Sequence, residues 1–255
     1  MGGCLSSQSG GGPPTSSSGV WPTAAPDAPL QRRRTPLAVV GCGGHASCVI
    51  DCVELQGEYE VAALVDDFKA PGTRVCGGYP VLGPCDADTI RRLREAGVES
   101  FVIAVGDNAT RAELAGKLRA LWPSAAAATL VHPRAFVARS ASLAEGTVVL
   151  PGAVVQVNCR VGSHCILNTR ASLDHDGVMG DFSALAPGAT VSGAVRIGAF
   201  SWVAAGAVVA HGREIGANTV VGAGAVVVRD IPDLVVAFGA PAKPVRARQA
   251  TDEYL

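Results

Sequence analysis

Residues that could act as a base and as a donor to negative charge lie in the second half of this 255-residue chain. His175 is followed by Asp176, and Gly193 comes eighteen residues after the histidine. A neutral histidine is the natural proton acceptor near pH 7. A glycine lets a substrate approach its backbone N–H, which can then donate to a developing oxyanion. The three residues are therefore candidates for a catalytic site.

The sequence alone does not decide which residue would orient His175. Neighbouring residues in a strand point to opposite faces, so Asp176 can reach the ring only if the chain turns there. Asp174 is the alternative orienting residue. By type and spacing alone, His175 could also be an exposed turn residue without a chemical role.

A second group of glycine and polar residues follows three short apolar runs in the first half. A helix N-terminus in such a position can hold phosphate, and acids at strand ends can read a ribose or a base. Simple turns are the alternative, because the glycine-rich turn lacks the third glycine of the dinucleotide fingerprint. The candidates are Gly43, Gly44, His45, Asp66, Asp67, Gly106 and Asn108.

Strand and helix patterns alternate over residues 37–130. The apolar runs 37–41, 61–65 and 101–105 predict strands, with helices between and after them. Asp86 or Asp88 is expected to cap the second helix, and Asn108 the third. This alternation predicts a parallel sheet, in which ligands bind at the carboxyl ends of the strands.

Residues 131–230 show a repeat of six residues. Small residues recur four positions after most of the aliphatic ones, and Gly162, Gly180, Gly198 and Gly216 are eighteen residues apart. The seventeen aliphatic positions are Val131, Val137, Leu143, Val149, Val155, Val161, Leu167, Leu173, Met179, Leu185, Val191, Ile197, Val203, Val209, Ile215, Val221 and Val227.

Six residues is not a whole number of 3.6-residue turns, so a helix does not explain this repeat. A coil of three short strands does, with aliphatic side chains inside and small ones at the corners. About five to six coils, stacked ~4.8 Å apart, would form a prism roughly 25–30 Å long. Gly193 would then lie one coil away from His175.

The coil spacing argues against a metal site. Zinc needs three or four ligands that converge at ~2 Å. His211 lies two coils from His175, roughly 9–10 Å along the prism, and His164 lies in a different column. We therefore expect no bound metal.

Composition excludes several classes of protein. The formal net charge of −1 argues against nucleic acid as a partner. No apolar run approaches the ~18 residues that a membrane span needs. The eight cysteines form no C-x-x-C pair, which suggests a reducing compartment with buried thiols.

Residues 1–36 are rich in Gly, Ser and Pro, and we expect a disordered tail. Its first six residues, Met1-Gly2-Gly3-Cys4-Leu5-Ser6, fit a myristoylation pattern. Contact with a membrane is expected only if this N-terminus is lipidated.

The hexapeptide repeat resembles that of left-handed β-helix acyltransferases. The segments Gly41-Cys42-Gly43-Gly44-His45-Ala46, Val65-Asp66-Asp67-Phe68 and Ala104-Val105-Gly106-Asp107-Asn108 resemble the sugar acetyltransferases of the sialic acid O-acetyltransferase (NeuD) family. That family includes the acetyltransferases of UDP-amino-sugar pathways. The resemblance implies a Rossmann-like α/β domain over 37–130, which would bind the sugar nucleotide. A left-handed parallel β-helix of hexapeptide repeats over 131–236 and a C-terminal segment over 237–255 would follow.

The resemblance also implies roles for single residues. His175 corresponds to the family's general base and Asp176 to its acidic companion, within Asn168-Thr169-Arg170-Ala171-Ser172-Leu173-Asp174-His175-Asp176. Asn168 corresponds to an asparagine near the acceptor. Gly193 corresponds to a glycine whose N–H faces the acetyl carbonyl, and Ala205 and Ala223 to residues that line the coenzyme A channel.

One position departs from the family. Ala184 stands where the relatives have a histidine that contacts acetyl-CoA, which puts one donor to the thioester in doubt. The expected function is acetyl-CoA-dependent acetylation of an amino or hydroxyl group of a nucleotide-linked sugar by a cytoplasmic homotrimer. A non-catalytic accessory factor in sialic acid or surface-glycan synthesis is the alternative, and a β-helical zinc carbonic anhydrase is the least favoured.

Overall fold

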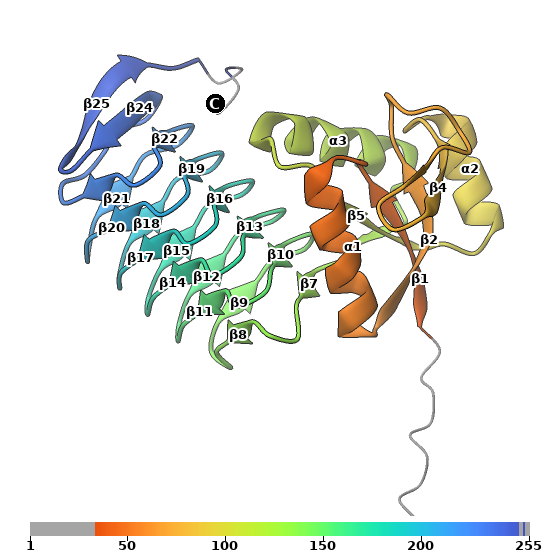
Figure 1. The fold of residues 1–255 in the computed structure, drawn as a ribbon, viewed down its shortest axis with the longest axis horizontal. Helices are drawn as coiled ribbons and strands as arrows, with labels where there is room; N and C mark the ends of the chain where they lie inside the picture. Colours follow the sequence, from red (N-terminus) through yellow and green to blue (C-terminus); the bar gives the residue numbers. More distant parts are fainter. Residues whose placement is uncertain (1–33, 250–251, 253–255) are drawn as a thin grey trace, which may run out of the picture. The chain divides into compact units, whose positions relative to one another are not determined.

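The computed structural model describes residues 34–249 and residue 252, and these described residues belong to one compact unit (Figure 1). The acylation pattern and nearly all of the expected tail lie outside the described residues. Strand β1 begins at Thr35, two residues before the expected domain boundary. In the described part of the chain, no helix has the length and apolar character needed to cross a bilayer.

The N-terminal part is an α/β sandwich around a six-stranded sheet with the strand order β3-β4-β2-β1-β5-β6. The three predicted strands lie together at its centre and are parallel, as expected. The prediction missed β3, β4 and β6, and β3 pairs antiparallel with β4, so the sheet is mixed. The elements are β1 (Thr35–Val40), α1 (Gly44–Gln56), β2 (Tyr59–Val65), β3 (Arg74–Val75), β4 (Tyr79–Gly83), α2 (Ala87–Glu95), β5 (Ser100–Ile103), α3 (Asn108–Leu121) and β6 (Ala126–Ala127).

Helix capping confirms one prediction and corrects another. Asp86 caps α2, because its carboxylate accepts the backbone N–H of Thr89 at 2.9 Å. For α3 the predicted cap Asn108 was wrong: Asp107 accepts the N–H of Thr110 at 2.8 Å. Both residue types make good caps, and tertiary contacts of Asn108 decide between them.

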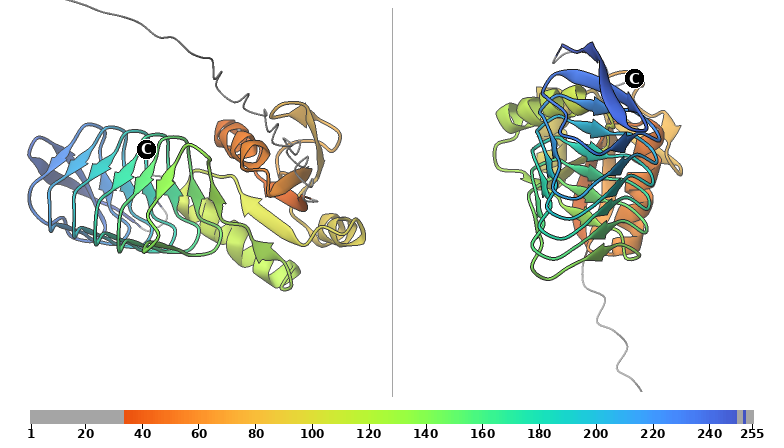
Figure 2. Two further views of the ribbon diagram at one scale, coloured as in Figure 1. Left: turned by 90° about the horizontal axis from the view of Figure 1, so that it is seen from below. Right: turned by 90° about the vertical axis from the view of Figure 1, so that its left-hand side faces the viewer.

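The C-terminal part is a parallel β-helix with three faces, stacked coil upon coil (Figure 2, left). The first face comprises β7 (Leu130–Val131), β10 (Val148–Val149), β13 (Ile166–Leu167), β16 (Ala184–Leu185), β19 (Trp202–Val203), β22 (Val220–Val221), β24 (Val235–Gly239) and β25 (Ala242–Ala247). The second face comprises β8 (Phe136–Val137), β11 (Val154–Val155), β14 (Ser172–Leu173), β17 (Thr190–Val191), β20 (Val208–Val209) and β23 (Val226–Val227). The third face comprises β9 (Ser142–Leu143), β12 (Arg160–Val161), β15 (Val178–Met179), β18 (Arg196–Ile197) and β21 (Glu214–Ile215).

The register confirms the predicted coil of eighteen residues, since Val155 pairs with Leu173 and Leu173 with Val191. The aliphatic residues of the repeat form the interior, and the small corner residues Ala153, Cys159 and Ala171 are fully buried among them. The last coil is shorter. Val220 pairs with Val236, sixteen residues on, so β24 crosses the expected boundary between residues 236 and 237.

The α/β part is attached to the β-helix by the N-terminal half of α3. Arg111 is 1% exposed and donates to the carbonyls of His164 at 2.7 Å and Phe182 at 2.9 Å. Asn108 donates to the carbonyl of Phe200 at 3.1 Å. These acceptors lie one above another where the third face meets the first, here called edge 3–1. Three rings stack there as well, since that of Phe182 lies 5.2 Å from those of both His164 and Phe200.

Replacing Arg111 by Met should therefore destabilise the fold. One buried carbonyl and several partly buried ones would lose a charged donor, and the free energy of unfolding should fall by about 3 kcal/mol or more. Urea unfolding followed by circular dichroism measures this. Arg119→Met on the same helix is the matched control, because Arg119 is 74% exposed in its ion pair with Glu145. An exposed pair contributes roughly 1 kcal/mol or less. Equal losses in both variants would contradict the role of Arg111.

Candidate functional site

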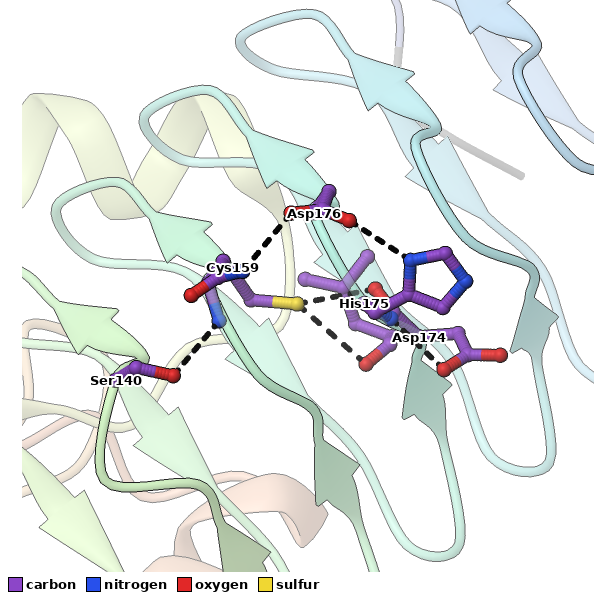
Figure 3. Close-up of polar contacts among 7 residues, drawn as sticks. Ser140, Cys159, Asp174, His175 and Asp176 are labelled. Atoms are coloured by element: carbon purple, nitrogen blue, oxygen red, sulfur yellow. Dashed lines mark hydrogen bonds and ion pairs between the residues drawn. The ribbon is translucent and has the colours of Figure 1, made fainter.

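His175 lies in the turn between β14 and β15, where the second face meets the third, here called edge 2–3. Asp176 adopts a left-handed conformation (φ +60°), so the chain does turn, and its Oδ2 lies 2.8 Å from Nδ1 of the ring (Figure 3). Asp174 instead accepts the backbone N–H of His175 at 2.8 Å. Of the two alternatives left open by the sequence, Asp176 is the residue that contacts the imidazole.

The contact between His175 and Asp176 shifts the pKa of both side chains. The hydrogen bond to Asp176 raises the pKa of His175, and the charge of Asp174 acts in the same direction. Hydrogen bonds from His175 and Asn158 lower the pKa of Asp176. A carboxylate beside Nδ1 favours the tautomer with the proton on that atom, which leaves Nε2 as the basic nitrogen of the neutral ring.

Gly193 lies on the next coil, directly beside the ring, as the eighteen-residue spacing predicts. Ala194 donates to the carbonyl of His175 at 2.8 Å, which joins the two turns. A Cβ at position 193 would overlap Nε2 of His175, so the imidazole needs a glycine there. No acceptor within the described residues takes the Gly193 N–H, which leaves it available to a ligand beside Nε2.

His211 lies one coil further along edge 2–3. Its ring centroid is 5.9 Å from that of His175, closer than the two-coil spacing predicted, because Gly193 leaves the space between them free of side chains. Across the described residues, no group of three or more His, Cys, Asp or Glu side chains is arranged to hold a metal ion.

The other predicted site residues of the β-helix lie elsewhere. Asn168 is in the turn between β13 and β14, Ala205 between β19 and β20, and Ala223 between β22 and β23. These turns form edge 1–2, where the first face meets the second. Gly224 donates to the carbonyl of Ala205 at 2.9 Å, so the two alanines stack, and both are exposed. The full width of the second face separates them from His175, and a single chain does not bring the two groups together.

Ala184 is fully buried on β16. It pairs with Ile166 and Trp202 in the first face and packs in a small apolar cluster with them. Its methyl group offers no surface to a ligand within the chain.

The predicted residues of the α/β part gather around one cavity of ≈ 570 Å³ at the carboxyl ends of β1, β2 and β5. Gly43, Gly44, His45 and Gly106 line it, together with the acid pair Asp66 and Asp67. Asn108 does not. It is 5% exposed and binds the β-helix, so the structure gives it a structural position rather than one facing a ligand.

Both carboxylates of the acid pair are held by backbone N–H groups. Asp66 accepts from Cys42 at 2.8 Å and from Phe68 and Lys69 at 3.0 Å. Asp67 accepts from Cys85 at 2.6 Å. Within the chain, Asp66 and Asp67 therefore stabilise turns, as the simple-turn alternative predicts. A contact with a ligand would come in addition to these hydrogen bonds.

Three lining residues carry chemistry that sequence reasoning did not assign. Phe68 is 97% exposed at the rim of the cavity, where a flat base could stack on its ring. Lys69 and Lys117 also line the cavity, and Nζ of Lys117 lies 3.2 Å from Oδ2 of Asp67. Burial lowers the pKa of His45 to about 4, and Arg111 adds to this effect, so His45 is neutral at pH 7.

Comparisons with known proteins agree with both parts of the fold. Residues 36–118 match the family described as PglD N-terminal domain, and residues 194–229 match bacterial transferase hexapeptide (six repeats). UDP-N-acetylbacillosamine N-acetyltransferase of Bacillus subtilis is 40% identical over 116 residues, which are 45% of this chain. The match spans half (50%) of the length of that relative.

Two solved structures are similar over nearly their full length. One is a variant of GDP-perosamine N-acetyl transferase from Caulobacter crescentus, in complex with CoA and GDP-perosamine. It is 39% identical with a TM-score of 0.77, and the match covers 83% of this chain and 97% of that chain. The other is the acetyltransferase domain of PglB from Neisseria gonorrhoeae, in complex with acetyl coenzyme A. It is 34% identical with a TM-score of 0.74, and the match covers 84% and 100%.

The contact between His175 and Asp176 predicts a measurable shift of the histidine pKa. In Asp176→Asn the neutral amide no longer stabilises the imidazolium, so the pKa of His175 should fall towards its ordinary value. The acidic limb of any activity that needs the neutral ring should move to lower pH by the same amount. NMR titration of the five histidines measures the first effect without a substrate. An unchanged His175 titration would contradict the assigned contact.

Proposed function

The chain belongs to the hexapeptide-repeat sugar N-acetyltransferases with a PglD-type N-terminal domain, and from this premise we propose its reaction. It transfers an acetyl group from acetyl-CoA to the amino group of a nucleotide-linked amino sugar. The observation that carries the proposal is the His175 ring, which Asp176 holds with Nε2 against Gly193. The relatives supply the substrate classes, since their structures hold CoA, acetyl coenzyme A and GDP-perosamine.

The geometry supports direct transfer. The lone pair of the sugar amine attacks the thioester carbonyl carbon, and His175 Nε2 accepts the proton that the nitrogen loses. The Gly193 N–H donates to the oxyanion that forms on the carbonyl oxygen. The carbon–sulfur bond then breaks, and coenzyme A leaves as a thiolate that takes up a proton. Asp176 keeps Nδ1 protonated throughout.

The α/β cavity would hold the nucleotide. Backbone N–H groups at Gly43 and Gly44 lie at the start of α1, a position suited to phosphate, and Phe68 offers an aromatic face to the base. His45 contributes no positive charge at pH 7, so Lys69 and Lys117 would supply the cationic groups. Acetylation of a hydroxyl, as on sialic acid, is the alternative reaction, and the named relatives favour the amine.

We further propose a homotrimer, with the donor between neighbouring subunits. Edge 2–3 carries the base His175, and edge 1–2 carries Ala205 and Ala223. The base and the two alanines could therefore contact the same acetyl-CoA molecule only if edge 2–3 of one subunit meets edge 1–2 of another. The second face, between these edges, presents exposed apolar side chains such as Phe136 (54% exposed) and Val208 (39% exposed). A cytoplasmic location fits the supply of acetyl-CoA and the free cysteines of the described residues.

The reaction is tested by release of free coenzyme A from acetyl-CoA with UDP- and GDP-linked amino sugars, and with matched sugars that carry a hydroxyl instead. His175→Ala should lower kcat by about 10²–10⁴-fold, because the general base is lost. Binding of CoA and the thermal unfolding midpoint should stay as in the wild type. Full activity in this variant would show that the assigned base is wrong, and CoA binding without turnover on any sugar would favour the accessory-factor alternative.

The oligomer is tested at its second face. Light scattering of the wild type should give about three times the chain mass of 25.8 kDa. Val208→Glu places a charge on the second face, so the trimer should dissociate and activity should fall with it. Leu55→Glu, at an even more exposed apolar position on α1 (55% exposed), should leave both unchanged. A monomeric but fully active wild type would contradict the proposal.

A further inference from the structure

Three residues occupy equivalent positions on successive coils at edge 2–3. Ser140, Asn158 and Asp176 are eighteen residues apart, and the last two share the left-handed conformation (φ +61° and +60°). Asparagine and aspartate tolerate this conformation better than most side chains. The turn geometry therefore permits an amide directly beneath the carboxylate that contacts His175.

Hydrogen bonds connect this column to the imidazole (Figure 3). The backbone N–H of Asn158 donates to Oγ of Ser140 at 3.1 Å. Its side-chain Nδ2 donates to Oδ1 of Asp176 at 3.1 Å, while Oδ2 of the same carboxylate faces His175 at 2.8 Å. Asp176 is thus held at both oxygens, one by the ring and one by the amide.

The second contact matters because Asp176 is open to water. Its side chain is 53% exposed, and it lines a polar groove of ≈ 500 Å³ together with Asn158, Arg160 and Arg196. A carboxylate in such a place has several solvated rotamers that do not face the ring. The amide of Asn158 restrains the rotation that would carry Oδ2 away from His175, and its N–H stabilises the charged carboxylate.

We propose that Asn158 is a positioning residue of the transferase, acting on His175 through Asp176. This inference rests on the proposed function, in which His175 is the base. Asn158 itself touches neither the base nor, in this assignment, the acetyl group. Asn158 increases the fraction of time that Asp176 spends against Nδ1 of His175. It thereby affects the orientation and the proton affinity of the imidazole.

The test uses Asn158→Gly, which removes the amide and keeps a residue suited to a positive φ. We expect kcat to fall about tenfold, as for outer residues that orient a functional side chain, with KM for acetyl-CoA within about twofold. The pKa of His175, followed by NMR, should fall below that of the wild type. Asn218→Gly is the matched control, because Asn218 has the same left-handed conformation (φ +51°) at a different edge, and it should match the wild type in all three measurements.

A double-variant cycle identifies the route of the effect. If Asn158 acts through Asp176, Asn158→Gly should change kcat little further in the Asp176→Asn background. Additive losses, a wild-type His175 pKa in Asn158→Gly, or equal losses in Asn218→Gly would each overturn the inference. Because the NMR titration needs no substrate, it still decides whether Asn158 controls His175 if the wild type acetylates no sugar. A wild type that acetylates no sugar would count against the proposed function and not against the role of Asn158.

Discussion

The parallel hydrogen bonds between successive coils constrain everything else in the β-helix. The backbone N–H of Asp174 donates to the carbonyl of Val191, and that of Val178 donates to the carbonyl of Val195, both at 2.9 Å. In this parallel register each residue lies beside the one eighteen positions further along the chain. Backbone groups inside a fold must find partners, so a coil cannot shift without losing several of these bonds. The constraint turns a spacing in the chain into a neighbour in space, and it places a glycine, two histidines and an aspartate along one edge.

A second constraint fixes the two parts of the molecule to each other. Arg111 spans from the carbonyl of Gly106, which lines the α/β cavity, to those of His164 and Phe182 on the β-helix. A buried guanidinium has five N–H groups in a rigid fork, so it can hold several carbonyls in one geometry at once. The cavity that would hold a nucleotide and the edge that carries the base therefore belong to one connected framework. Burial is the main cause of the lowered pKa of His45 in the cavity wall, and the charge of the same arginine acts in the same direction.

The sequence predicts the regular features of this protein well and the irregular ones poorly. The six-residue repeat gives the faces, the coil length and the adjacency of His175 and Gly193, because one short-range rule is applied many times. Asn108 was assigned to a ligand because it follows a strand, yet it binds the β-helix. Which partner a polar side chain takes depends on how two domains dock, and local pattern carries no signal for that. Asn158 was missed for a related reason: an asparagine in a turn is ordinary until the next coil brings a carboxylate against it.

The hairpin at the end of the first face has a consequence for assembly. A stack of parallel strands ends in unpaired N–H and C=O groups, which invite another chain to add on and extend the stack into a fibre. Here the final strand, β25, runs antiparallel to β24 and carries Lys243, Pro244 and Arg246. Proline cannot donate a hydrogen bond, and the charged side chains resist burial, so end-to-end addition at this strand is disfavoured. The hairpin thus limits the first face to a finite length and keeps a repetitive sequence from polymerising through it.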